Sequence, residues 1–284
     1  MDAVTIAVAQ MTSGIDPDAN LDQIADAAIM ARAVGAAMLF LPEMALLLDR
    51  DRTRSAAHLT SEAASSWPAQ LAKIAADHGL WLHSGSAPFL ADDGDGRVNR
   101  SLLFSPDGAL VARYDKIHMF DVDLPGGESW RESASYTGGD RLVLADTPAG
   151  CLGLTICFDL RFPELFTALV GVGATIIAVP AAFTVPTGTV HWHILLRARA
   201  IETGCFIIAA AQGGTHADGR TTYGHSLIID PWGKILAEGP EGSSGASTPV
   251  VLTAKIDPKA VNEARSAIPL ARSRAVRNIT LQSY

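Results

Sequence analysis

The sequence predicts an α/β fold, a four-layer αββα sandwich in which helices cover the outer faces of two sheets. Short apolar runs typical of buried strands alternate along the chain with helical patterns, which is typical of sheets covered by helices. A strand–helix–strand unit also occurs twice, near the N-terminus and again after residue 150. Two such βαβ-like halves can pair sheet against sheet, and that pairing gives four layers.

The first half begins with an apolar strand over residues 4–10. Asp16 is suited to cap a helix that starts at Pro17, because proline is tolerated in the first turn. Gly35 ends this helix, and residues 38–41 form the next strand. One apolar helical face is expected from Leu21, Ile24, Ala25, Ala28 and Ile29.

The second half repeats this plan. We expect a strand over residues 151–156, a helix over 163–172 and a strand over 175–179. The pattern Gly-Ala, five residues, Pro occurs in both halves, at 35–42 and at 173–180. The structural context of this short pattern is the same in both places, which favours related halves.

Further elements follow from periodicity and turn residues. We expect helices over residues 61–78 and 189–203, strands over 81–89, 98–104, 110–114 and 205–211, and a hairpin of 224–230 with 235–238. A Gly/Ser-rich loop over residues 240–249 is too short to link domains. No shift in composition marks a boundary, so residues 1–284 are expected to form a single domain.

Composition limits the possible partners. The chain has 284 residues, 48% of them hydrophobic and 18% charged, with a formal net charge of −8. The negative charge argues against nucleic acid, since phosphate binding needs clustered basic residues. The low charged fraction predicts surface hidden in a homodimer or higher homo-oligomer. The tail of about residues 265–284 carries Arg265, Arg272, Arg274 and Arg277, and we expect it in subunit contacts or in solvent.

Cysteine usage and the N-terminus predict a cytoplasmic protein. Three cysteines without framework spacing indicate a reducing compartment, and the first ten residues do not resemble a signal peptide. Residues 165–190 carry no charge, but their prolines and glycines favour a buried helix and strand over a membrane span. We therefore expect no membrane partner.

Cys157 is the strongest candidate for a reactive group. It lies where the apolar strand at 151–156 stops and the helix expected from Pro163 approaches. A thiol near helix-terminal N–H groups is expected to favour the thiolate and to act as a nucleophile. The competing interpretation is a buried, inert cysteine, so partner residues must decide.

Candidate partners lie at other strand ends. Glu43 follows a buried strand, Lys116 follows the strand ending at Tyr114, and Glu132 lies in a Ser- and Gly-rich connection. Taken alone, each of these residues is more simply interpreted as a surface residue. Together they are chemically sufficient: Glu43 can serve as base, and a lysine between two carboxylates stays protonated and polarises a carbonyl.

The chain resembles the carbon–nitrogen hydrolase (nitrilase) superfamily. The runs that carry the resemblance are LFLPEM, YDKIHMFDVDLPG, RES and TICFDLRFPEL. The resemblance implies a Glu43–Lys116–Cys157 triad with Glu132 as a second glutamate, and an oxyanion donor at the Phe158 backbone N–H. It also implies the αββα sandwich, a dimer that continues the four layers, and no cofactor.

Within that superfamily the stretches LLRARAIETGC, AAAQGGTH and YGHS look most like the deaminated glutathione amidase branch. The function implied is hydrolysis of the carboxamide of a small acidic substrate to carboxylate and ammonia through a cysteine thioester. Alternatives are an omega-amidase acting on 2-oxoglutaramate or 2-oxosuccinamate, and hydrolysis of nitriles or N-carbamoyl amino acids. A non-catalytic binding protein is disfavoured because all four polar positions are present. A Cys–His hydrolase using His118 would leave Lys116 unexplained.

Substrate contacts are expected from apolar and cationic side chains. Phe120, Phe183 and Trp192 are candidate pocket liners, with His191 beside them at a helix start. Arg161 and Arg199 are candidates for binding a substrate carboxylate, or else for structural ion pairs. No metal is expected, since the histidines at 191, 193, 216 and 225 lack the spacing of a metal motif.

Overall fold

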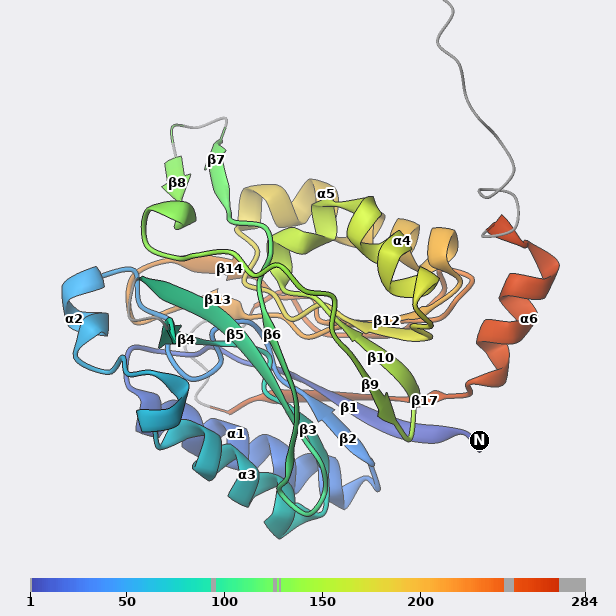
Figure 1. The fold of residues 1–284 in the computed structure, drawn as a ribbon, viewed down its shortest axis with the longest axis horizontal. Coiled ribbons are helices and arrows are strands. Elements are labelled where there is room, and N and C mark those ends of the chain that lie inside the picture. Colours follow the sequence, from blue (N-terminus) through green and yellow to red (C-terminus); the bar gives the residue numbers. More distant parts are fainter. Residues whose placement is uncertain (1, 93–95, 125–126, 128, 243–247, 271–284) are drawn as a thin grey trace, which may run out of the picture.

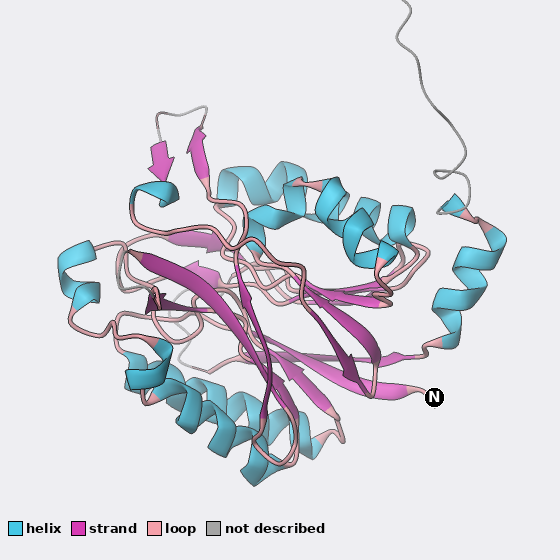
Figure 2. Ribbon diagram, in the orientation of Figure 1, coloured by secondary structure: helices cyan, strands magenta, loops and turns pink. Residues whose placement is uncertain are grey.

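Two β-sheets pack face to face, and helices cover the outer face of each (Figures 1 and 2). This computed structural model describes residues 2–92, 96–124, 127, 129–242 and 248–270. The expected four-layer α/β architecture is confirmed. Both βαβ units are present, because β1 pairs in parallel with β2 around α1, and β10 pairs in parallel with β11 around α4.

The first sheet contains seven strands within the described residues, in the order β17-β1-β2-β3-β5-β4, with β6 paired to β5. Their bounds are β1 Val4–Gln10, β2 Met38–Phe40, β3 Trp81–His83, β4 Ala87–Leu90, β5 Arg97–Phe104, β6 Leu110–Asp115 and β17 Val250–Ile256. The strands β1, β2 and β3 are parallel, whereas β5 and β17 run antiparallel to their neighbours.

The second sheet has the order β16-β15-β12-β11-β10-β9, again counting only the described part of the chain. Its strands are β9 Leu144–Thr147, β10 Gly150–Leu154, β11 Ile176–Ala178, β12 Phe206–Ala209, β15 Leu227–Ile229 and β16 Ile235–Glu238. Two small ribbons add β7 Asp121–Asp123 with β8 Ser129–Arg131, and β13 Gly213–Thr215 with β14 Thr221–Tyr223.

The helices form the two outer layers. Figure 1 shows α1 and α3 below the first sheet, and α4 and α5 above the second. The α-helices are α1 Pro17–Ala33, α2 Arg52–Ala56, α3 Trp67–His78, α4 Pro163–Gly171, α5 Val185–Thr203 and α6 Lys259–Ala267. The 3₁₀ turns are η1 Glu62–Ala64, η2 Glu132–Ala134 and η3 Cys157–Arg161. As expected, Asp16 caps α1, where its carboxylate accepts a hydrogen bond of 3.1 Å from the Asp18 N–H.

Side chains alternate between two cores along the strands. In β1, Ile6 and Val8 pack into the core between the sheets, whereas Ala7 and Ala9 pack against α1 and α3. Both faces are therefore buried, and this explains why the strands are near-continuous apolar runs instead of strict alternations.

Three predicted elements differ most from their observed bounds. The helix expected over residues 61–78 begins only at Trp67, because Ser61 forms a β-bridge with Leu90. The strand expected over 81–89 is broken between β3 and β4. At the break Gly85 has φ +65°, and a Cβ there would lie 1.9 Å from the Pro42 carbonyl oxygen, so the chain passes too close for a side chain.

The helix expected over 189–203 starts earlier, at Val185, with Pro186 in its first turn. His191 and Trp192 therefore lie two turns inside α5 and not at its start. Residues 165–190 form α4, β11 and the first part of α5. Within the described residues, no helix combines the length and apolar character needed to cross a bilayer.

Arg265 belongs to the body of the chain. Its guanidinium donates to the carbonyl oxygens of Thr203 at 3.2 Å and Ala174 at 2.7 Å. The expectation that the tail of about residues 265–284 takes part in subunit contacts stays a prediction. Arg272, Arg274 and Arg277 lie outside the described residues.

His83 provides a test of the buried polar core. It is fully buried at the end of β3, where Nδ1 accepts from the Gly85 N–H at 3.3 Å and Nε2 lies 3.0 Å from Ser101 Oγ. Burial lowers the pKa of His83 from 6.5 to about 3. The folded state therefore keeps His83 neutral, and stability is lost as the pH falls from 6.5 toward 3, where the unfolded chain binds the proton more tightly.

Because of this histidine, we expect the free energy of unfolding to be about 2 kcal/mol lower at pH 5.0 than at pH 7.5. Urea unfolding of the native protein and of His83→Gln, at both pH values, measures this difference. The variant should lose about 2 kcal/mol less than the native protein over that interval. An identical pH dependence in both proteins would show that His83 does not titrate as described.

Candidate active site

Four segments bring polar groups to one edge of the two sheets. Glu43 follows β2, Cys157 follows β10 and Ala182 follows β11, so all three come from the carboxyl ends of parallel strands. Lys116 follows β6, and its backbone N–H donates to the Asn99 carbonyl of β5 at 2.9 Å. The residues predicted from sequence therefore meet in space, although the chain separates Glu43 from Cys157 by more than a hundred positions.

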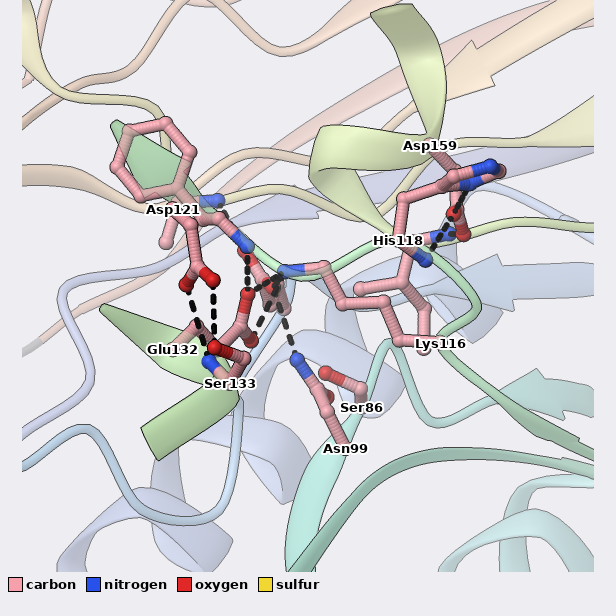
Figure 3. A network of polar contacts seen from close by, with 12 residues as sticks. Ser86, Asn99, Lys116, His118, Asp121, Glu132, Ser133 and Asp159 are labelled. Atoms are coloured by element: carbon pink, nitrogen blue, oxygen red, sulfur yellow. Dashed lines mark hydrogen bonds and ion pairs between the residues drawn. The ribbon is translucent and has the colours of Figure 1, made fainter. Parts of the chain in front are cut away.

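Lys116 lies at the centre of this cluster (Figure 3). Its side chain is 2% exposed, and Nζ donates to Glu43 Oε1 at 3.0 Å and to Glu132 Oε1 and Oε2 at 3.0 and 2.8 Å. Burial alone lowers the pKa of Lys116, but the carboxylates of Glu132 and Glu43 raise it well above its ordinary value. The ammonium is therefore charged at neutral pH, as expected from its two carboxylate neighbours.

Glu43 is fixed by donors from both sheets. Its Oε1 accepts from Asn99 Nδ2 of β5 at 2.9 Å, in addition to Lys116. Its Oε2 accepts from the Ala182 backbone N–H, beyond β11, at 2.9 Å. The carboxylate also interacts with the Cys157 thiol and contributes to its raised pKa. A buried carboxylate needs such partners, and here they aim it at the sulfur.

Glu132 enters from the connection after β8, at the start of η2. Besides holding Lys116, its Oε2 accepts a 2.6 Å hydrogen bond from the Phe120 N–H. The backbone therefore orients this carboxylate, and the carboxylate orients the ammonium.

Cys157 begins η3 in a strained conformation. Its φ is +47°, a left-handed value that non-glycine residues rarely adopt, and its N–H donates to the Pro180 carbonyl at 2.9 Å. Burial and the charge of Glu43 raise the pKa of the Cys157 thiol well above its ordinary value, although Lys116 opposes them.

The expectation of a resting thiolate is therefore wrong. The 3₁₀ turn η3 separates Cys157 from the helix that starts at Pro163, so the sulfur does not lie at that helix terminus. The thiol must instead lose its proton to a neighbouring base when substrate is present, and Glu43 is in position to accept it.

Asp159 joins the lysine segment to the cysteine turn. It is fully buried, and its carboxylate accepts from Tyr114 Oη at 2.6 Å, from the His118 N–H at 3.0 Å and from the Ile156 N–H at 2.9 Å. Of these partners, Tyr114 lies two residues before Lys116 and His118 lies two residues after it. Asp159 also contacts His118 Nδ1 at 2.7 Å, which ties this ring to a carboxylate and not to the Cys157 sulfur (Figure 3).

A cavity of about 570 Å³ opens onto the cluster. Its lining includes Glu43, Lys116, Glu132 and Cys157 together with Phe120, Phe158, Phe183 and Arg161. Phe120 and Phe158 meet edge to face with ring centroids 5.2 Å apart. The Arg161 guanidinium lies over the rings of Phe158 and Phe183, at 5.8 and 5.5 Å from their centroids.

Three predicted substrate contacts do not line this cavity. Trp192 is fully buried behind Phe183, with ring centroids 4.8 Å apart, and its Nε1 donates to the His225 carbonyl. His191 contacts Arg161 from outside, at 3.3 Å. Arg199 donates to the Leu160 carbonyl and pairs with Glu202 at 2.8 Å, so it is a structural residue.

Two of the four histidines considered for metal binding lie together on one carboxylate, and the other two lie elsewhere. His193 Nε2 and His225 Nδ1 both contact Glu238 Oε1, at 3.0 and 2.9 Å, and these three ligand atoms lie within 4.8 Å of one another. That group is not among the residues that line the cavity. His216 lies elsewhere, between the Ser13 carbonyl and Thr222 Oγ1.

Sequence reasoning missed three groups of the site. Asn99 carried a signal, since it is a polar residue at a fully buried position of an apolar strand. Asp159 lies two residues after Cys157 and was detectable as a charge in an apolar run. The role of the Ala182 backbone N–H could not be predicted, because a backbone group does not depend on which side chain the residue carries.

Comparison with known proteins agrees with this geometry. The chain is 41% identical over 272 residues to a deaminated glutathione amidase of Yersinia enterocolitica, covering 95% of this chain and 92% of that protein. The crystal structure of Saccharomyces cerevisiae Nit3, a member of branch 10 of the nitrilase superfamily, superposes with a TM-score of 0.84 at 29% identity, covering 96% and 97% of the two chains.

A glutamate-to-glutamine mutant of an amidase from Nesterenkonia sp. AN1, whose active-site cysteine carries an acrylamide adduct, superposes with a TM-score of 0.75 at 27% identity, covering 95% of this chain and 99% of that one. The carbon-nitrogen hydrolase family model matches residues 5–266. With its acid, ammonium and thiol in one cavity, the chain belongs to the carbon–nitrogen hydrolase family.

Proposed function

We propose that this amidase cleaves an amide of a small acidic substrate of the deaminated glutathione type, through a thioester on Cys157. The observation that carries the proposal is the position of Lys116, which lies between Glu43 and Glu132 in the same cavity as the thiol. A carbonyl oxygen placed there meets a buried positive charge, which is the arrangement that stabilises a tetrahedral oxyanion.

In the first step Glu43 takes the proton of the Cys157 thiol as the sulfur bonds to the amide carbon. Lys116 Nζ and the Phe158 backbone N–H hold the oxyanion. Glu43 then gives its proton to the leaving nitrogen, the C–N bond breaks and a thioester remains. Because the resting thiol has a raised pKa, proton transfer to Glu43 is part of the attack and does not precede it.

In the second step Glu43 deprotonates a water molecule that attacks the thioester carbon. The C–S bond breaks, the sulfur recovers the proton and the carboxylic acid is released. Glu132 keeps Lys116 oriented throughout, since two of its oxygens accept from Nζ.

The leaving group depends on the substrate. A primary carboxamide such as 2-oxoglutaramate releases ammonia. Deaminated glutathione, in which a ketone replaces the amino group of glutathione, instead releases an amine from its internal amide. An ammonia assay alone therefore does not detect hydrolysis of deaminated glutathione, and the released amine must be measured as well.

Replacing the nucleophile or the ammonium should remove activity. We expect Cys157→Ala to reduce turnover to background and Lys116→Ala to reduce kcat at least about 10²-fold, since one oxyanion donor contributes roughly 3 kcal/mol. Steady-state rates and circular dichroism of both variants test this. Cys151→Ser is the matched control, because Cys151 lies outside the cavity and should leave turnover unchanged. Turnover that survives in purified Cys157→Ala would refute the thioester route.

Substrate class can be tested with a panel. Amine and ammonia release should be compared for deaminated glutathione, 2-oxoglutaramate, a simple aliphatic nitrile and an N-carbamoyl amino acid. We expect the highest kcat/KM for deaminated glutathione and a thioester adduct in intact-mass spectra. Faster turnover of 2-oxoglutaramate would indicate an omega-amidase, and turnover of nitriles alone would contradict the proposal.

A homodimer is also proposed, with α5 at its interface. Along one face of α5, Val190, Ile194 and Ile201 are 55%, 69% and 49% exposed, an apolar stripe that a monomer would leave in water. The spacing of these three residues places them on one side of the helix.

We expect light scattering to give the mass of a dimer for the native chain and of a monomer for Ile194→Lys. The matched control is Ile29→Lys, because Ile29 is 55% exposed on α1, in the opposite outer layer. A monomeric native protein, or an Ile194→Lys variant that remains dimeric, would contradict the interface.

A further inference from the structure

The cavity carries more positive charge than the reaction requires. Besides Lys116, its lining contains the arginines Arg50, Arg52, Arg97, Arg131, Arg161 and Arg220. The whole chain has a formal charge of −8, so this concentration of guanidinium groups runs against the average charge of the protein. A local field of that sign favours anionic ligands.

Most of these arginines are already paired or exposed. Arg131 bonds Asp123 at 2.8 Å and Arg220 bonds Asp218 at 2.7 Å, whereas Arg50 and Arg52 are exposed to solvent. Arg97 and Arg161 are different: both are half-buried, and within the described part of the chain their side-chain bonds go to no carboxylate. A partly desolvated guanidinium without a counter-charge is unfavourable until an anion binds.

The two arginines approach the cavity from opposite sheets. Arg161 lies in η3, four residues after Cys157, and is held over the rings of Phe158 and Phe183. Arg97 begins β5 of the first sheet, on the strand face that also presents Asn99, since side chains alternate along a strand. Asn99 bonds Glu43, so Arg97 lies about 7 Å along β5 from a residue that touches the base.

Arg97 is anchored without being neutralised. NH1 donates to Ser55 Oγ at 3.3 Å and NH2 donates to the Arg52 carbonyl at 3.1 Å. Both acceptors belong to α2, the Tyr136 side chain is a third polar neighbour of Arg97, and none of the three is a carboxylate. These bonds fix the position of the guanidinium and leave its charge available to a ligand.

We propose that Arg97 is a carboxylate-binding residue on the leaving-group side of the substrate, and that Arg161 binds the acyl-side carboxylate. The site then selects an elongated dianion with a carboxylate at each end and the scissile amide between them. This inference rests on the proposed function and names its substrate class: deaminated glutathione has this form, whereas 2-oxoglutaramate lacks the second carboxylate.

The test combines an Arg97 variant with a matched pair of substrates. These are deaminated glutathione and its analogue whose glycine carboxylate is a carboxamide. For Arg97→Gln we expect kcat/KM for deaminated glutathione to fall about 10- to 100-fold, mainly through KM, because a charge-assisted bond is lost. For the analogue the variant and the native enzyme should agree within about twofold, since the partner of Arg97 is already absent.

Arg113→Gln is the control, because Arg113 is an exposed arginine of β6 that pairs with Glu62 outside the cavity and should leave both rates unchanged. Equal losses on both substrates would show that Arg97 only supports the fold, and no loss on deaminated glutathione would show that it binds nothing. Either result overturns the inference.

A binding measurement separates this inference from the proposed reaction. Calorimetric titration of Cys157→Ala with deaminated glutathione should show affinity that falls about 10- to 100-fold on adding Arg97→Gln. If the native enzyme hydrolyses neither substrate, the proposed function fails. The titration still decides whether Arg97 recognises the second carboxylate, and unchanged affinity in the double variant would overturn that role.

Discussion

The ammonium of Lys116 is a full charge buried almost completely, and the rest of the site is organised around it. An isolated ammonium at such a depth would lose its proton or destabilise the fold. Here Glu43 and Glu132 bring two negative charges within 3.0 Å, so the cluster of three carries a net negative charge. Burial, together with the charge of Glu43, raises the pKa of the neighbouring thiol against the opposing charge of Lys116, which explains why this cysteine rests protonated and needs Glu43 as its base.

The fold positions these charges through connections between the sheets. Glu43 comes from the first sheet but is held by the Ala182 N–H from the second, and Lys116 reaches the same carboxylate from β6. The large apolar core between the sheets fixes the distance across which these bonds form. A shift of one sheet against the other would therefore separate the base from its partners, so packing far from the cavity supports the chemistry.

Asp159 makes a second connection of this kind. Its carboxylate ties Tyr114 and His118, on either side of Lys116, to the turn that carries Cys157. The same turn holds Cys157 at φ +47°, a conformation that persists because surrounding bonds determine it. One buried side chain thus links the segment that carries the ammonium to the turn that carries the sulfur.

Much of the architecture was predictable from sequence because local patterns encode it. Apolar runs, the Asp16 cap and the turn glycines predicted both βαβ units, and the four motif runs pointed to Glu43, Lys116, Glu132 and Cys157. Element ends were less predictable, since a close backbone approach at Gly85 and a bridge from Ser61 to Leu90 depend on contacts between distant segments.

The sequence by itself therefore determined the kind of fold and the chemical groups of the site. Only the tertiary structure decided how those groups behave. It placed the thiol away from the helix terminus. It also buried Arg199 and Trp192 outside the cavity lining, where they bond backbone carbonyls. Arg97 and Arg161 have no carboxylate partner among the described residues. The physical reason is that the burial of a group and its distance from other charges set its protonation and its pairing. Burial and distance arise when distant segments pack together, so they cannot be read from residues that are neighbours in sequence.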